Sequence, residues 1–471
     1  MTGLGFAEHL EHPQGRGTHP AGGATGVAGG ALCGDLVTIS VAVEADRVAA
    51  AGFDASGCGA AVAAGSAAVA LVVGRPLLEA ARVSGAAVAA ELGGLSPGKL
   101  HASDLAADAL HQALGAAARR DAALLPSPDR TLVAMSGGVD SAVAALLVAR
   151  GGREAVAVTL ELWRDPDNDA EASCCSASAV RAARAVAHDL GLPHFTLDLR
   201  DEFRAGVVQP FLDDHRAGLT PNPCVRCNGG VRLDAMVLFA DSMGAADLAT
   251  GHYARKAADG RLRAAADPNK DQAYMLAATG ANTRARLRFP LGELTKPQVR
   301  ALAAEAGLSV ASKKESQDLC FLAGTGKAAF LAKHGGLKDA AGPIVDLAGR
   351  RVGAHRGHQH FTVGQRRGIG VAAPEPLYVL ATDAATNSVT VGPRVALRSV
   401  RVAVRDTVLS GDATDVDSVR LRYRARPLPC RIVGEGPTVE VELHEPVEGA
   451  APGQVAVFLR GDIVAGHGII A

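Results

Sequence analysis

Aromatic residues are scarce in this chain, and neither sign of charge is in excess. Aromatics make up 3% of its 471 residues, so the cores must be built from Ala, Val and Leu. Lys and Arg number 48 against 49 for Asp and Glu, which excludes a uniformly basic nucleic-acid binder but leaves room for a local basic patch. The hydrophobic share of 48% excludes a wholly disordered chain.

The sequence also lacks the marks of secretion and of a membrane span. Glu8 and Glu11 stand near the N-terminus, where a signal peptide needs a basic segment. Residues 55–74 carry no charge, but they are mostly Ala, Gly and Ser, which gain little from lipid, so a buried helix is the better interpretation. We therefore predict a cytoplasmic protein with no membrane partner. Its eight cysteines are then better explained as metal ligands, nucleophiles or core residues than as a disulfide framework.

The order of hydrophobic patterns predicts an α/β protein with a β-rich end. Residues 1–30 are rich in Gly, His and Pro and are expected to be mobile at the start. From residue 131 onward, strands alternate with helices, which predicts a doubly wound parallel sheet. After about residue 340, short Val-rich strands with Gly and Pro turns predict small barrels. The expected elements are antiparallel strands at 36–43 and 46–57, helices at 59–73, 76–82, 103–120, 141–150 and 176–190, and strands at 131–136, 155–162 and 194–199.

These patterns divide the chain into parts. LLPSPDR at 124–130 carries two prolines and is the natural linker between an N-terminal domain and the parallel sheet. The predicted parts are an α+β domain at 1–122, a linker at 123–130, a nucleotide-binding domain at 131–308, a central domain at 309–393 and a barrel-like domain at 394–471.

The sharpest motif is Ser-Gly-Gly-Val-Asp-Ser at 136–141, between a buried strand and a helix. Free backbone N–H groups and the helix dipole make an anion site at such a junction, and two glycines let the backbone approach phosphate closely. Asp140 can hold Mg²⁺ against a pyrophosphate. No Lys follows as in a Walker A loop, so transfer of the terminal phosphoryl group is not the expected chemistry. The plain alternative is an ordinary Gly-rich turn, but the strand, Asp140 and Ser141 together favour a nucleotide site.

A pair of thiols, Cys224 and Cys227, forms the second motif. A zinc ribbon needs a second such pair, which the sequence lacks, and a thioredoxin-like pair needs a fold that the phosphate loop argues against. Pro221 and Pro223 predict a rigid extended segment just before the thiols, and Arg226 could lower their pKa. Activated cysteines on a rigid segment suit sulfur chemistry, while core thiols are the plain alternative.

Taken together, the motifs resemble those of the tRNA-specific 2-thiouridylases (MnmA family), which are PP-loop ATP pyrophosphatases. The resemblance covers about 130–471, with its motifs in the family's order. After SGGVDS they are TPNPCVRCN at 220–228, TGHY at 250–253, KDQ at 270–272, SQDLCF at 316–321 and TVGQRR at 362–367.

The resemblance implies ATP-dependent 2-thiolation of the wobble uridine (U34) of a tRNA. The C2 oxygen is adenylated, and sulfur carried as a persulfide on Cys320 then replaces AMP, with Cys227 as the nucleophile and Asp140 serving Mg²⁺. ATP contacts carry over to Ala134, Met135, Ser136, Gly137, Gly138, Val139, Asp140, Ser141, Leu160 and Gly251. Contacts with tRNA carry over to Asn222, Pro223, Cys224, His252, Lys270, Asp271, Gln272, Arg422, Tyr423 and Gln454.

Another sulfur mechanism stays open. Cys224, Cys227 and Cys320 are three thiolates, enough to hold a [4Fe–4S] cluster with one iron free to bind hydrosulfide. Some members of the family have Asp at the position of Cys224, so this chain has the softer ligand there. Sequence alone does not separate the persulfide route from the cluster route.

Local basic charge predicts where RNA binds. Residues 394–431 contain nine Arg and four Asp. Arg420, Arg422, Arg424 and Arg426 alternate, and in a strand they would share one face that could track the RNA backbone. A solvated edge strand is the alternative, because charges also block edge pairing.

Residues 30–115 resemble the NifU/IscU-type iron–sulfur scaffolds, through Cys-Gly-Asp at 33–35, Gly-Cys-Gly at 57–59 and Lys-Leu-His at 99–101. The scaffold's third cysteine is Ala102 here, so Cys33, Asp35, Cys58 and His101 remain as ligands for Zn²⁺ or a labile cluster. The implied role is sulfur or cluster delivery, or docking of a cysteine desulfurase or sulfur-relay protein.

Two other functions compete with the sulfurtransferase. One is a non-catalytic iron–sulfur scaffold whose PP-loop half is degenerate, and the intact SGGVDS, CVRC and SQDLC motifs argue against it. The other is an amide-forming PP-loop synthetase, which would lack the paired thiols.

Overall fold

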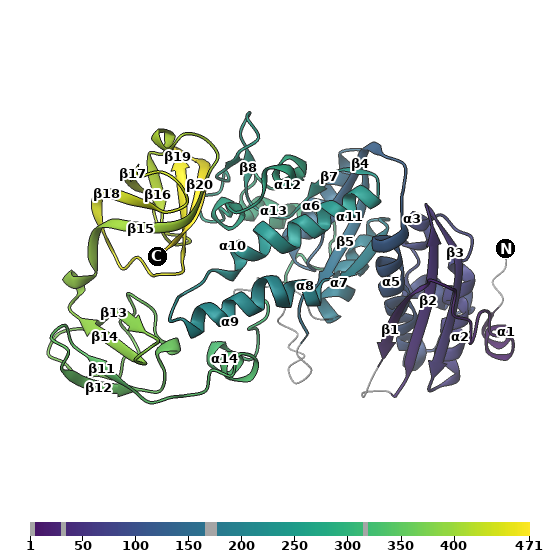
Figure 1. Ribbon diagram of the computed structural model, residues 1–471. Coiled ribbons are helices and arrows are strands. Elements are labelled where there is room, and N and C mark those ends of the chain that lie inside the picture. The colour runs from purple at the N-terminus through teal and green to yellow at the C-terminus, as the bar shows by residue number, and fades with distance from the viewer. Residues whose placement is uncertain (1–4, 30–33, 165–176, 314–318) are drawn as a thin grey trace. The chain divides into compact units, whose positions relative to one another are not determined.

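The computed structural model describes residues 5–29, 34–164, 177–313 and 319–471 (Figure 1). The chain divides into two compact units. The first unit comprises 1–200, 235–252 and 286–320, and the second comprises 201–234, 253–285 and 321–471. No helix in the described ranges is both long and apolar enough to cross a membrane.

The first unit begins with a three-stranded antiparallel sheet in the order β1-β2-β3, with α5 packed against β1 and β2. The expectation that the start is mobile is wrong for residues 5–11 and 24–29, which form α1 and β1; His9 is buried with its Nδ1 2.8 Å from Ser66 Oγ. Residues 60–69 of α2 are all buried, which confirms the buried helix. The elements are α1 (Gly5–Glu11), β1 (Ala24–Gly29), β2 (Leu36–Glu44), β3 (Arg47–Ser56), α2 (Gly59–Val72), α3 (Leu77–Ala80), α4 (Gly85–Glu91) and α5 (Leu100–Asp121).

A parallel five-stranded sheet in the order β10-β7-β4-β5-β6 forms the rest of this unit and confirms the predicted fold class. Ala155–Leu160 of β5 are buried without alternation, as a parallel strand covered on both faces requires. β4 begins at Ser127, so the predicted linker ends inside a strand. The elements are β4 (Ser127–Ala134), α6 (Val139–Arg150), β5 (Glu154–Glu161), α7 (Ala177–Asp189), β6 (His194–Asp198), α11 (Leu233–Ser242), β7 (Ala245–Ala249), β10 (Leu287–Arg288) and α13 (Lys296–Glu305).

Within this unit α5 packs directly against the edge strand β6, which we call the α5–β6 interface. His111 Nδ1 lies 3.0 Å from the carbonyl oxygen of His194, and Arg119 Nη1 donates to that of Asp198 at 3.1 Å. Between them, an ideal Cβ on Gly115 would lie 1.8 Å from the Thr196 carbonyl oxygen, so only glycine fits. Residues four apart on a helix share one face, and carbonyls two residues apart on a strand point the same way. One face of α5 therefore meets one row of β6 carbonyls.

A buried ion pair adds to this interface. Asp108 of α5 accepts a hydrogen bond from Arg184 of α7, and the two side chains are 11% and 9% exposed. Arg181, which is 54% exposed, contacts the same carboxylate at 3.0 Å. The N-terminal domain is therefore packed onto the parallel sheet and is more than an appendage on a linker.

The second unit holds two β structures, which confirms the small β-rich domains. A four-stranded sheet runs β12-β11-β14-β13, and β15-β18-β17-β16-β19-β20 closes into a barrel because β15 pairs with both β18 and β20. Val404, Val419, Val441 and Phe458 fill the barrel. The strands are β8 (Arg255–Lys256), β9 (Leu262–Arg263), β11 (Gly342–Val345), β12 (Arg351–His355), β13 (Tyr378–Asp383), β14 (Ser388–Gly392), β15 (Arg398–Leu409), β16 (Ser418–Arg420), β17 (Leu428–Val433), β18 (Val439–Glu448), β19 (Val455–Arg460) and β20 (Ile463–Ile470).

Further short α-helices of the described residues lie outside the sheets. They are α8 (Arg200–Phe203), α9 (Gln209–Arg216), α10 (Pro223–Cys227), α12 (Ala281–Arg286) and α14 (Lys327–Gly335).

Candidate active site and candidate metal centre

The phosphate loop connects β4 to α6 as the sequence predicts. Ser136 N–H donates to Ser141 Oγ at 3.1 Å, and that hydroxyl donates to the Gly138 carbonyl at 3.1 Å, which closes the loop on itself. Gly137 has φ +68°, and a Cβ there would lie 2.6 Å from the Ala179 carbonyl oxygen, so a side chain would be strained and would clash. No side chain caps α6 at Gly138, which leaves the first N–H groups of the helix for an anion.

Two lysines reach this loop from a distant segment. Lys296 Nζ donates to both carboxylate oxygens of Asp140, at 2.7 and 2.8 Å, and Lys296 is buried. Lys313 Nζ donates to the Gly137 carbonyl at 2.9 Å. They supply cations that the loop itself lacks. Sequence reasoning missed both, because 156 and 176 residues separate the partners and no local pattern marks them.

The other predicted ATP residues of this unit gather at one sheet edge. Ala134 ends β4 and Met135 follows it, Leu160 lies near the end of β5, and Gly251 follows β7. These three strands are neighbours in the sheet, and ligands of open α/β sheets bind at the carboxyl ends of such strands. A Cβ on Gly251 would lie 2.7 Å from the Ser141 backbone nitrogen, so this glycine lets the chain approach the loop.

Cys224 and Cys227 lie on a helix, so the expectation of an extended segment up to the thiols needs correction. Pro223 is the first residue of α10, where its fixed φ favours helix and its missing N–H costs nothing. Asn222 caps α10 by accepting the Val225 N–H at 3.3 Å. Cys227 is 7% exposed and Cys224 is half-buried, three residues apart and so near one face.

Two other residues of the predicted thiol chemistry, Arg226 and Cys320, belong to different units. Arg226, expected to lower the thiol pKa, lies 4.0 Å from the Asp214 carboxylate. Cys320 is half-buried in a turn at the end of the first unit, and Ser316, Gln317 and Asp318 before it lie outside the described residues. Cys174 and Cys175 also lie outside the described residues.

Two residues of the Lys-Asp-Gln segment are committed to the fold. Asp271 Oδ1 accepts the N–H groups of Ala265 and Ala273, both at 3.1 Å, and its Oδ2 accepts Arg420 Nη1 at 3.0 Å. Gln272 Oε1 accepts the Tyr253 N–H at 2.9 Å. These two side chains therefore shape the segment, while Lys270 lies half-buried at its start. His252, in the first unit, is buried with its Nδ1 3.0 Å from Thr250 Oγ1.

The predicted arginine stripe does not form. Strand β16 ends at Arg420, and Arg424 follows in a turn with φ +63°, so the arginines do not share one strand face. Arg420 is paired with Asp271 and Arg426 with Glu445. The prediction failed because β16 ends at Arg420 and the chain turns at Arg424, so no single strand carries the alternation that the sequence suggests.

The basic excess counted over 394–431 is also reduced by pairing across the barrel. Arg401 contacts Glu440 and Glu442 of β18, and Arg431 contacts Glu442. Arg394 pairs with Glu448. These acidic residues lie after residue 431, outside the Arg-rich stretch at 394–431.

A smaller basic surface remains, formed by Arg366, Arg367, Arg422 and Arg424, all exposed; we call it the basic corner. A Cβ on Gly364 would lie 3.8 Å from Arg422 Nη2, which places this arginine beside the TVGQRR motif. Arg424 lies over the Tyr423 ring at 5.4 Å. A charged, aromatic corner of this kind suits a nucleic-acid strand.

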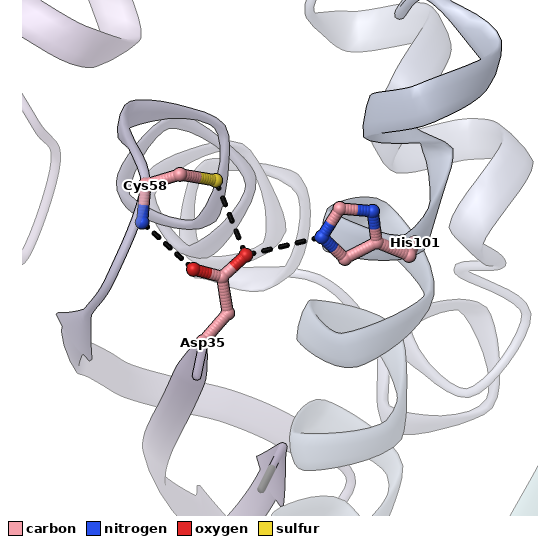
Figure 2. Close-up of side chains that lie close together, drawn as sticks. All are labelled: Asp35, Cys58 and His101. Carbon is pink, nitrogen blue, oxygen red and sulfur yellow. Dashed lines mark hydrogen bonds and ion pairs between the residues drawn. The ribbon is translucent and has the colours of Figure 1, made fainter. Parts of the chain in front are cut away.

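Asp35, Cys58 and His101 come together where β2, α2 and α5 begin (Figure 2). Asp35 Oδ2 accepts from Cys58 Sγ at 3.2 Å and lies 3.1 Å from His101 Nε2, while Oδ1 accepts the Cys58 N–H at 2.7 Å. The backbone hydrogen bond from Cys58, with the side chains of Cys58 and His101, lowers the pKa of Asp35. One ligand atom from each lies within 4.8 Å of the others, a spacing that one metal ion could bridge.

The rest of the predicted metal set differs from the scaffold pattern. Ala102 is fully buried behind His101 in α5, so it can contribute nothing to a ligand set. Cys33 lies outside the described residues. Thiolate, imidazole and carboxylate together suit Zn²⁺ or Fe²⁺.

Two histidines and one cysteine of the second unit have local roles in the fold. His355 Nδ1 accepts the Gly357 N–H at 2.9 Å, and His360 Nε2 lies 3.0 Å from Asp339 Oδ1. Cys430 is buried in the barrel, and burial raises the pKa of its thiol to about 12.

The fold and this site define a class: a PP-loop nucleotide-binding protein joined to β-barrel domains and to a NifU-like domain. Known families match most of the chain. Residues 6–123 match the NifU-like N terminal domain, 129–324 the tRNA methyl transferase HUP domain, 328–393 the tRNA methyl transferase PRC-barrel domain and 410–470 the aminomethyltransferase beta-barrel domain.

Relatives extend the match to the whole chain. The bifunctional protein NifU/MnmA of Rubrobacter xylanophilus is 42% identical over 98% of this chain and 97% of its own. The tRNA-specific 2-thiouridylases MnmA of Azorhizobium caulinodans (44%, 71% of this chain, 89% of theirs) and of a Roseiflexus species (42%, 73% and 99%) match the part after the N-terminal domain. The chain belongs to the MnmA family of tRNA 2-thiouridylases, in the form that carries an N-terminal NifU-like domain.

Proposed function

We propose that this protein uses ATP to replace the C2 oxygen of a wobble uridine in tRNA with sulfur. The single observation that carries the proposal is the phosphate loop held closed by Ser136 and Ser141, with Asp140 and Lys296 at its helix end. A degenerate loop of a non-catalytic scaffold would not need a buried lysine on its acid. Since tRNA is the substrate, we place the reaction in the cytoplasm.

The loop's own groups account for the adenylation step. N–H groups at the start of α6 bind pyrophosphate oxygens, and Lys296 adds a positive charge beside them. Asp140, with its carboxylate at the helix start, would hold Mg²⁺, and oxygen ligands suit that ion. Mg²⁺ would neutralise charge on the leaving pyrophosphate. The uridine O2 attacks the α-phosphorus, and the bond to pyrophosphate breaks.

The thiols account for the second step. The terminal sulfur of a persulfide on Cys320 attacks C2, and the C2–O bond breaks as AMP leaves. Cys227 thiolate then attacks Cys320 sulfur, which frees 2-thiouridine and leaves a disulfide that an external thiol reduces. The low exposure of Cys227 protects it from other oxidants until the substrate arrives. The cluster route would instead use Cys224, Cys227 and Cys320 together.

For the N-terminal domain we propose sulfur delivery with a single metal ion. Asp35, Cys58 and His101 fit one Zn²⁺ or Fe²⁺, with Cys33 as a fourth candidate, and when bound the ion would fix the geometry of the thiolates. A cysteine desulfurase or a sulfur-relay protein is the proposed partner. The basic corner, with Lys270 and Gln454, is the proposed tRNA surface.

The deciding experiment measures pyrophosphate release from ATP with and without tRNA, and 2-thiouridine by mass spectrometry of digested tRNA. We expect tRNA-dependent pyrophosphate in wild type and none in Asp140→Asn, whose tRNA affinity should hold. Pyrophosphate release at the wild-type rate by Asp140→Asn would remove the loop from the mechanism. Cys224→Ser separates the sulfur routes, because only the cluster route loses iron and activity together.

A further inference from the structure

The C-terminal barrel grips the segment that leads into the cysteine helix. Thr220 N–H donates to the Pro452 carbonyl at 2.8 Å, and Gln454 Nε2 donates to the Thr220 carbonyl at 2.8 Å. Both backbone polar groups of Thr220 are thus held by residues 451–454, which connect β18 to β19. Thr220 stands four residues before Cys224.

Gly453 makes this approach possible. Its φ is +89°, and a Cβ there would lie 2.9 Å from both Leu219 Cβ and the Thr220 nitrogen. The gripping residues are themselves anchored, because Gly453 N–H donates to Ile470 and Ile470 N–H donates to Gln454, both at 2.8 Å. Residues 451–454 are therefore a fixed part of the barrel and no loose loop.

A second contact reaches the helix by another path. Tyr274 is buried, and its hydroxyl donates to the Val455 carbonyl at 2.7 Å. Burial raises the pKa of this hydroxyl, and the Asn222 side chain near it acts to lower that pKa; Asn222 also caps α10. The residue after the gripping segment is thereby tied to the cap of the helix that carries both thiols.

We propose that residues 451–454 are a positioning element for the cysteine helix, and that Gln454 acts in it through Thr220. Family resemblance places Gln454 at the tRNA, but its amide N–H serves the protein here. The barrel that carries the basic corner is also the part that fixes α10, so binding of tRNA to the barrel reaches the thiols through these contacts. The importance of Cys227 rests on the proposed function, whereas the positioning of α10 by residues 451–454 does not.

Thiol reactivity in the free protein measures this directly. Cys227 is 7% exposed, so a small alkylating reagent reaches it only when α10 loosens. Losing one hydrogen bond shifts such an opening equilibrium by about fivefold. A residue that only touches tRNA would change nothing when tRNA is absent.

The experiment measures N-ethylmaleimide labelling of Cys224 and Cys227 by mass spectrometry in the full-length protein without tRNA. We expect Gln454→Glu, which keeps the shape but loses the donor, to label Cys227 about fivefold faster. Gln454→Lys, which keeps a donor, should label at close to the wild-type rate. Arg431→Gln, on the outer face of the same barrel, is the control for general loosening and should match wild type.

Thermal unfolding of each variant separates local loosening from global destabilisation. Gly453→Ala should give the larger effect, and if it fails to fold, Gln454→Glu still decides the matter. Wild-type labelling in Gln454→Glu overturns the proposal, as does equal acceleration in Arg431→Gln. Absence of 2-thiouridine formation by wild type would count against the proposed function and leave the labelling result standing.

Discussion

Cys58 in the N-terminal domain and Cys227 on α10 are the same residue type in opposite surroundings. Cys58 is exposed at the start of α2, with Asp35 and His101 within bonding distance of one ion. Cys227 is buried within a short helix that Asn222 caps, and Gln454 donates to Thr220 in the segment before that helix. An open, donor-rich thiol suits exchange of a metal or of sulfur with a partner. A closed and positioned thiol suits a single reaction on a bound substrate.

The largest expected effect tests this division. Cys227→Ser should reduce thiolation by about a thousandfold or more, because a serine hydroxyl does not take over attack by a thiolate. Pyrophosphate release should continue. Cys58→Ser, assayed with an excess of a polysulfide that can load Cys320 with sulfane sulfur, should thiolate at the wild-type rate. Equal losses in the two variants would erase the difference between the sites.

A second test asks whether the N-terminal site is separable from the parallel sheet. Asp108→Asn should lower the free energy of unfolding by about 3 kcal/mol, because it leaves Arg184 buried without a charged partner. Urea unfolding measures this. Arg181→Gln removes the exposed partner of the same carboxylate and should cost under about 1 kcal/mol. Similar small costs for both would mean that the α5–β6 interface is loose.

A third test concerns metal binding at the Asp35, Cys58 and His101 cluster. Asp35→Asn should weaken Zn²⁺ binding by about ten- to a hundredfold, because it removes a ligand charge and the group that orients both other ligands. Competition with a chromogenic chelator gives the affinity. Cys430→Ser, distant in sequence and buried in the barrel, is the control. Unchanged Zn²⁺ affinity would leave the cluster without a metal role.

The pH dependence of this site has a definite sign. The pKa of Asp35 is lowered in the folded protein, so its ionised form contributes stability above the ordinary pKa of about 3.9, and that contribution is lost as pH falls through the lowered pKa. The difference in urea midpoint between wild type and Asp35→Asn should be constant from pH 7 to pH 5 and shrink below pH 4. A difference that grows on acidification would contradict this assignment.

The smallest effect concerns a third thiol. Burial raises the pKa of the Cys430 thiol to about 12, so the thiol stays largely protonated at pH 9. Iodoacetamide at that pH should label Cys58 and leave Cys430 unlabelled in the folded protein. Cys430→Val should leave thiolation unchanged. Rapid labelling of Cys430 would show that the barrel opens.

Sequence reasoning succeeded where the chemistry lies in one contiguous stretch. SGGVDS carries its strand, turn and helix start in neighbouring residues, so the loop and its edge of the sheet were predictable. Asp35, Cys58 and His101 were grouped correctly because the family resemblance aligns them. Lys296 was not predictable, because only the packing of α13 against α6 brings it to Asp140.

The arginines show the opposite case. Charge was counted along the chain, but pairing occurs across strands, and β18 supplies Glu440, Glu442 and Glu448 to neutralise it. An alternating pattern also predicts a shared face only if the strand continues, and Arg424 turns the chain at φ +63°. The family resemblance predicts that Gln454 contacts tRNA, but it does not predict that the Gln454 amide donates to the Thr220 carbonyl.

The α5–β6 interface has a consequence for how the protein behaves outside its reaction. An edge strand presents unpaired carbonyls that can recruit a strand from another molecule. Here His111, Gly115 and Arg119 cover the carbonyls of His194, Thr196 and Asp198. The NifU-like domain is thus also a shield for the sheet. We expect a protease that cuts between the two domains to release a PP-loop fragment whose uncovered edge strand favours self-association. The NifU-like domain would then limit self-association in addition to its proposed role in sulfur delivery.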